Sequence, residues 1–119
     1  MTDAASWLQP QGSVTVRLED DTPVLLLEGE IDSAAVAAYE TVFPAGAPSL
    51  PPLPPSRQAW VVDTSAVTFM NSSGVAFLVR CVEGMRAHGG RPVLRKPSRA
   101  TTKVLTLTGV STLFEMTDE

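Results

Sequence analysis

Apolar and polar residues alternate with a period of two near the start of the chain. Residues 13–19 alternate strictly, which predicts a β-strand with one face in water. Residues 24–30 form a more continuous apolar run and predict a second, more buried strand. Residues 20–23, Asp-Asp-Thr-Pro, are typical of a turn. The pattern therefore predicts an antiparallel hairpin.

The apolar spacing then changes to that of an α-helix. Residues 33–43 carry apolar side chains at helical spacing, and Asp32 or Ser33 can cap this helix. A second helix is predicted over residues 72–88, ending at Gly89-Gly90, and a third between Ser98 and Gly109.

Shorter apolar runs separate these helices. Residues 59–63 and 91–95 predict strands, and residues 111–115 predict a last strand or a tail. Pro92 favours an edge strand or a strand beginning, because proline cannot donate to a ladder. The order β-β-α-β-α-β-α-β predicts the α/β class, with a mixed sheet flanked by helices. A length of 119 residues suits one domain over residues 1–119.

Two segments lack this periodicity. Residues 1–12 are predicted to be a loose lead-in from which Trp7 can dock on the core. Residues 44–58 are rich in proline, and this run holds six of the ten prolines. It predicts an extended spacer loop. Its P-x-x-P spacings leave open a docking site for a proline-reading domain.

The helix over residues 72–88 has a readable apolar face. At 100° per residue, six side chains should face the sheet. They are Val75, Leu78, Val79, Cys81, Val82 and Met85. Four others should point away: Ala76, Arg80, Glu83 and Ala87. Phe77 lies on the flank, where it either packs under a neighbouring loop or waits for a partner.

Composition excludes several classes of function. A net charge of −4 argues against general nucleic-acid binding. Seven of the nine bases follow residue 79, which indicates solvated faces or a basic flank that steers an acidic partner. The lone Cys81, within an apolar segment, suits a buried position and a reducing compartment. No run approaches the ~20 apolar residues of a membrane span, and no secretory signal is visible, so we expect a cytoplasmic protein.

The candidate chemistry lies after the strand at residues 59–63. A short turn is predicted there, followed by Asn71, Ser72, Ser73 and Gly74 at the start of an apolar helix. A hydroxyl at a helix start can cap free N–H groups, or it can carry a phosphate where the helix dipole favours negative charge. Catalysis is rejected, because the single histidine, His88, lies ~22 Å along the same helix. No metal cluster or cofactor motif is present, and no cofactor is expected.

Four stretches resemble, in order, the motifs of a STAS domain, most closely a free-standing anti-sigma-factor antagonist. Residues 27–32 (LEGEID) resemble its G-E-[IL]-D signature, and residues 61–70 its central strand. Residues 71–75 (NSSGV) resemble its D-S-S-G-L phosphoacceptor turn, and residues 105–110 (LTLTGV) the end of its third helix. The proline-rich segment has no family counterpart and is interpreted as an insertion.

The resemblance implies partner switching. An unphosphorylated antagonist binds an anti-sigma factor that is also a serine kinase, and phosphorylation of the second serine, here Ser73 rather than Ser72, separates the two. The resemblance implies a monomer or weak homodimer when free, with no direct nucleic-acid contact and no membrane insertion. The implied contact residues are Asp32, Asn71, Ser72, Ser73, Gly74, Ala76, Phe77 and Arg80.

Asn71 departs from the aspartate usual in this motif. It can still cap the helix but removes a charge beside the acceptor. The resemblance therefore supports binding to the partner more strongly than recognition by the kinase. The alternative is therefore a STAS adaptor subunit that docks on a transporter ATPase or a stressosome-type assembly without phosphorylation.

Overall fold

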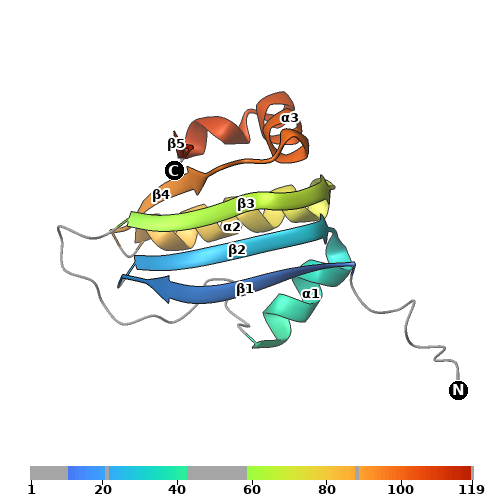
Figure 1. The fold of residues 1–119 in the computed structure, drawn as a ribbon, viewed down its shortest axis with the longest axis horizontal. Helices are drawn as coiled ribbons and strands as arrows, with labels where there is room; N and C mark the ends of the chain where they lie inside the picture. The colour runs from blue at the N-terminus through green and yellow to red at the C-terminus, as the bar shows by residue number, and fades with distance from the viewer. Residues whose placement is uncertain (1–10, 21, 43–58, 88, 119) are drawn as a thin grey trace, which may run out of the picture.

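The structure is a computed structural model that describes residues 11–20, 22–42, 59–87 and 89–118. Its elements follow the predicted order, with one added 3-10 turn (Figure 1). They are β1 (Gly12–Glu19), β2 (Thr22–Ile31), α1 (Ser33–Val42), β3 (Ala59–Met70), α2 (Ser72–Ala87), β4 (Arg91–Arg95), α3 (Arg99–Thr108), η3 (Val110–Leu113) and β5 (Glu115–Thr117).

The described strands form a single mixed sheet in the order β1-β2-β3-β4-β5. β1 pairs antiparallel with β2, which confirms the predicted hairpin, and each later neighbour is parallel to the strand before it. Parallel neighbours need crossover connections, and helices supply them. Figure 1 shows α2 behind the sheet, α1 below β1 and α3 beyond β4.

The core lies between one face of the sheet and the helices. Strand residues at alternate positions, such as Leu25, Leu27 and Val62, are buried there. The predicted apolar face of α2 is confirmed, since its members are buried except for Val79, which is half-buried. The four residues predicted to point away are exposed. The other face of β1–β3 has no helix in front of it (Figure 1).

The turn predicted at residues 20–23 is too long. Thr22 and Pro23 belong to β2 and pair with Glu19 and Leu18. Pro23 fits there because β2 begins to pair with β3 only at Val24, so no partner on that side needs its missing N–H group.

The short turn predicted after residue 63 is wrong, because β3 continues to Met70. β2 runs on to Ile31 and offers a partner along this whole stretch. The register shifts between Leu26 and Glu28 and between Gly29 and Glu30, so β3 holds more residues than β2 over the paired length. β-Bulges therefore accommodate a sequence whose polar residues suggested a turn.

Two smaller expectations at the C-terminal end also need correction. β4 is not an edge strand, since it lies between β3 and β5; Pro92 is near its beginning, before pairing with β5 starts at Val93. The last strand lies at Glu115–Thr117, because residues Val110–Leu113 form a 3-10 turn that leads to the buried Phe114.

Helix ends follow the predicted capping chemistry. Asp32, rather than Ser33, caps α1, because its Oδ1 accepts from the N–H groups of Ala34 and Ala35, both at 3.1 Å. Ser98 caps α3, and Gly109 ends it with φ 77°. Several predicted features lie outside the described residues: residues 1–10 of the lead-in, Phe43, the proline-rich segment and His88.

Candidate functional site

The start of α2 is held tightly against the end of β2. The Asn71 N–H group donates to the Ile31 carbonyl oxygen at 3.3 Å. A Cβ atom on Gly74 would lie 2.6 Å from that oxygen and 2.7 Å from Cγ of Met70. Only glycine fits this approach without displacement, so Gly74 sets the position of the first helical turn and is itself buried.

Asn71 provides the side-chain cap of α2. Its Oδ1 accepts from the N–H groups of Ser73 at 3.0 Å and Gly74 at 3.2 Å. Its carbonyl oxygen accepts from Val75 at 3.0 Å, which begins the helical hydrogen-bond pattern. An asparagine oxygen thus performs the capping that an aspartate would perform, without the charge.

The hydroxyls of Ser72 and Ser73 take no part in this cap. Ser72 is exposed and Ser73 is half-buried. Among the described residues, neither hydroxyl makes a hydrogen bond to another group. The Ser72 hydroxyl therefore takes no part in the cap, because Asn71 already accepts from the N–H groups that a cap would bind.

The other residues expected to contact a partner differ in availability. Ala76 is exposed beside Ser72 on the first turn. Arg80 is exposed, but Nη2 donates to Oε2 of Glu40 at 3.1 Å. Asp32 is half-buried and engaged in capping α1. The exposed surface at the start of α2 is thus made of small side chains, and Arg80, two turns further along the helix, is paired with Glu40.

Phe77 does not belong to this surface. Its side chain is 0% exposed, and its ring meets the Tyr39 ring of α1 edge-on, with centroids 5.1 Å apart and planes at 74°. The flank position on α2 faces α1, which the helix periodicity alone could not show. Phe77 joins the two helices and has no side-chain surface to offer a partner.

A charged cluster on the open face of the sheet was not foreseen. Arg95 of β4 donates through Nε to Oδ2 of Asp63 at 2.8 Å, and through Nη1 and Nη2 to Glu19 at 2.8 and 3.3 Å. Ser65 donates to Oδ1 of Asp63 from both its N–H group, at 3.0 Å, and its hydroxyl, at 2.7 Å. Glu19 and Arg95 are 76 positions apart in sequence, so only the sheet register brings them together.

These contacts shift the pKa values of the cluster. Burial alone would raise the pKa of Asp63, but the bonds from Ser65 and Arg95 outweigh it and hold the pKa below 3.8. The hydrogen bonds from Arg95 hold the pKa of Glu19 below 4.5. The same bonds raise the pKa of Arg95. The three groups satisfy one another, so the cluster supports the fold.

Two further expectations concern reactivity and charge. Cys81 is buried, and burial raises the pKa of its thiol to about 12, so it is an inert core residue as predicted. Much of the basic flank is engaged within the chain: Arg91 pairs with Glu115 at 2.6 Å, and Arg86 donates to the Leu113 carbonyl oxygen at 3.2 Å. This favours solvated, internally paired faces over a steering patch.

Two kinds of feature were not found in the part of the chain that the structure describes. No group of three or more His, Cys, Asp or Glu side chains there is placed to hold a metal ion. No helix among the described residues has the length and apolar character needed to cross a bilayer.

Comparison with known proteins agrees with this geometry. The family described as "Mlab, STAS domain" matches residues 14–116. No curated protein matches the sequence. An anti-sigma factor antagonist from Mycobacterium paratuberculosis is 28% identical, with a TM-score of 0.66 over 91% of this chain and 86% of that one.

Two more distant structures share the fold. An anti-sigma-factor antagonist (STAS) domain protein from Planctomyces limnophilus is 19% identical, with a TM-score of 0.68 over 87% of this chain and 88% of that one. The anti-sigma factor antagonist SpoIIAA in its unphosphorylated form is 21% identical, with a TM-score of 0.64 over 89% of each chain. With a family match over most of its length and a sheet of the same architecture, the chain belongs to the STAS-domain family.

Proposed function

We propose that this protein is an anti-sigma-factor antagonist that acts in the cytoplasm. It binds an anti-sigma factor with serine-kinase activity through the start of α2, and phosphorylation of Ser73 separates the two. One observation carries the proposal: the Ser73 hydroxyl makes no hydrogen bond to any described residue and lies on a helix turn that Asn71 already caps. The anti-sigma factor antagonist from Mycobacterium paratuberculosis, at 28% identity, supports the same role.

The fold should tolerate a phosphate on Ser73. The N–H groups of Ser73 and Gly74 donate to Asn71, so the phosphate does not have to replace the cap. It would add about −1.5 to −2 charges near the positive end of the helix dipole, which is a favourable position worth roughly 0.3–1 kcal/mol. Because Asn71 is neutral, no carboxylate at that position repels the new charge.

A docked partner should not tolerate the same phosphate. The first-turn surface is small, with Ser72, Ser73 and Ala76, so a partner can approach the backbone closely. A dianion inserted into that contact would lose its water, and the helix N–H groups of Ser73 and Gly74 are already occupied. Burial of such an uncompensated charge is costly, so the complex should dissociate.

The test is phosphorylation by the purified anti-sigma factor kinase of the same organism with ATP. Intact-mass measurement should show one added phosphate on the unsubstituted protein and on Ser72→Ala, and none on Ser73→Ala. A phosphate that persists in Ser73→Ala, or no phosphate on any variant, would contradict the assignment.

A second candidate function is an adaptor subunit that docks on a transporter ATPase or a stressosome-type assembly without phosphorylation. Asn71 favours the adaptor function, because it caps the helix and so forms the docking surface without the aspartate of the usual phosphoacceptor motif. The two functions differ in one measurement. A complex with an adaptor persists when ATP is added, whereas a partner-switching complex dissociates as phosphate appears on Ser73.

A further inference from the structure

A β-bulge near the end of β3 decides which way Phe69 points. The pairing with β2 passes from Gly29 opposite Val67 to Glu30 opposite Phe69, so Thr68 is an extra residue in β3. An extra residue reverses the alternation of the side chains that follow it. The sheet residues before and after the bulge therefore do not obey a single period of two.

The reversal takes Phe69 out of the core. In an unbroken strand, Phe69 would share the buried face of Val67, which is 3% exposed. With Thr68 inserted, Met70 occupies that face at 5% exposure, and Phe69 is 49% exposed. The fold thus presents a phenyl ring to solvent at a position where regular pairing would have buried it.

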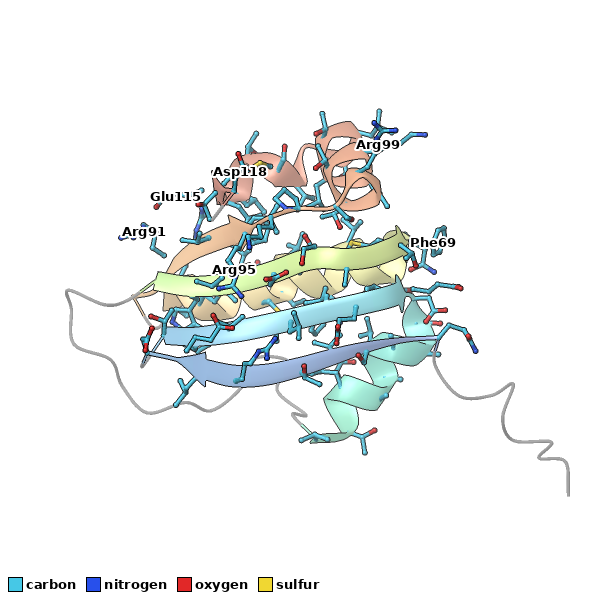
Figure 2. The ribbon with its side chains drawn as sticks, viewed as in Figure 1. Phe69, Arg91, Arg95, Arg99, Glu115 and Asp118 are labelled. Atoms are coloured by element: carbon cyan, nitrogen blue, oxygen red, sulfur yellow. The ribbon has the colours of Figure 1, made fainter. Side chains whose placement is uncertain are left out.

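The exposed ring lies beside the start of α2. Phe69 is two residues before Asn71, whose N–H group donates to Ile31, and Ile31 pairs with Met70. Figure 2 shows Phe69 at the end of β3, well away from Arg95 of β4, which pairs with Asp63 in the first half of β3. The ring and the two serine hydroxyls therefore occupy the same end of the sheet, at the exit of one strand.

We propose that Phe69 is an apolar anchor of the partner interface, and that its ring enters an apolar pocket on the anti-sigma factor that docks on the start of α2. The proposal rests on the proposed function, since the same partner makes both contacts. The residues of the first turn are too small to bury much apolar area themselves. A single aromatic side chain next to such a surface can supply a large share of the binding energy.

The chain offers a matched control for this ring. Leu18 is 53% exposed, close to the 49% of Phe69, and lies at the opposite end of the sheet because it pairs with Pro23 at the start of β2. If general surface apolarity drives association, both residues contribute. If the anchor is specific, only Phe69 does.

The experiment compares dissociation constants for the purified anti-sigma factor kinase of the same organism, measured by calorimetry without ATP. Phe69→Ala should weaken binding at least tenfold, and Leu18→Ala should change it by less than twofold. Phe69→Thr, which keeps a strand-forming residue and removes the ring, should weaken binding as much as Phe69→Ala. Circular dichroism melts identify a variant that does not fold, and the other Phe69 variant then supplies the result.

The outcomes separate this proposal from the proposed function through Ser73→Glu, measured in parallel. If Phe69→Ala and Phe69→Thr bind normally while Ser73→Glu binds weakly, the anchor is overturned and the switch stands. If Leu18→Ala loses as much affinity as Phe69→Ala, the anchor is also overturned, because the effect is not specific to that end of the sheet. If the unsubstituted protein does not bind the kinase, the proposed function fails and the anchor falls with it.

Discussion

The first half of β3 and the start of α2 hold polar groups in opposite situations. Asp63, in the first half, has both carboxylate oxygens engaged by Ser65 and Arg95 and is 6% exposed. Beyond the end of the strand, Ser72 and Ser73 carry hydroxyls that make no hydrogen bond to any residue the structure describes. The polar groups around Asp63 bind one another and stabilise the fold, whereas the serine hydroxyls after the end of β3 remain available to a partner.

This difference shows how to separate structural from functional polar residues in a small domain. A buried charge persists only when its partners surround it, and those partners then leave it nothing to offer a ligand. A functional surface has the opposite signature. Here Asn71 accepts from the N–H groups of Ser73, Gly74 and Val75, so the serine side chains can meet a partner without weakening the helix.

The largest stability effect should come from Arg95→Met, which keeps an unbranched apolar stem and removes the guanidinium group. Asp63 would remain buried without its charged donor, at a cost of about 2–3 kcal/mol in the free energy of unfolding. Arg91→Met is the control, because its pair with Glu115 is 63% and 59% exposed and should contribute less than about 1 kcal/mol. Urea unfolding measures both; equal losses would show that the cluster is no more than a surface pair.

Arg95→Met should also change how the stability of the protein depends on pH. In the folded protein the pKa values of Asp63 and Glu19 lie below their ordinary values of 3.8 and 4.5. The unfolded chain therefore binds more protons in this range, so stability is present above these values and is lost as pH falls through the lowered ones. Unfolding curves between neutral and acid pH should show a shallower loss for Arg95→Met, since the contacts from Arg95 that help to lower both pKa values are gone, while the bonds from Ser65 to Asp63 remain.

Gly74→Ala should have the next largest effect, and its sign is informative. In an ordinary helix interior, alanine is favoured over glycine by roughly 1 kcal/mol. Here the new Cβ would lie 2.6 Å from the Ile31 oxygen, so we expect a loss of about 1–3 kcal/mol. Thermal unfolding against Ala76→Gly, which should also lose about 1 kcal/mol at an exposed position of the same turn, tests this. A gain for Gly74→Ala would mean that the close packing is wrong.

The smallest effects should separate the cap from the hydroxyls. Asn71→Ala removes the acceptor for two N–H groups and should cost about 1 kcal/mol. Ser72→Ala should stay within roughly 0.5 kcal/mol, because that hydroxyl has no bond to lose. Asn71→Asp keeps the acceptor and should retain full stability. Comparable losses in the free energy of unfolding for Asn71→Ala and Ser72→Ala would show that Ser72 takes part in capping.

Local patterns were enough to predict the element order, the hairpin, the caps at Asn71 and Ser98 and the buried face of α2. Each depends on neighbours within one or two turns or on strict alternation, which the sequence displays directly. The length of β3 could not be predicted in this way. Its polar stretch after Asp63 looks like a turn until β2 is known to continue to Ile31 and to accept bulges.

The same limit applies to the site. The Asn71–Gly74 motif was found because its residues are contiguous, and its resemblance to the STAS phosphoacceptor turn is the basis for proposing Ser73 as the acceptor. The burial of Phe77 against Tyr39 depends on how α1 packs beside α2, and the exposure of Phe69 depends on one inserted residue. Contacts between distant segments and side-chain directions after a bulge are properties of the assembled sheet.

The most direct test of the central claim is the affinity of Ser73→Glu for the anti-sigma factor kinase, with Ser72→Glu as the matched control. Both variants add one carboxylate to the first turn of α2, and both should fold with unchanged circular dichroism. We expect at least a tenfold weaker dissociation constant for Ser73→Glu and a smaller change for Ser72→Glu. Unchanged affinity for Ser73→Glu, with the unsubstituted protein binding, would contradict the account.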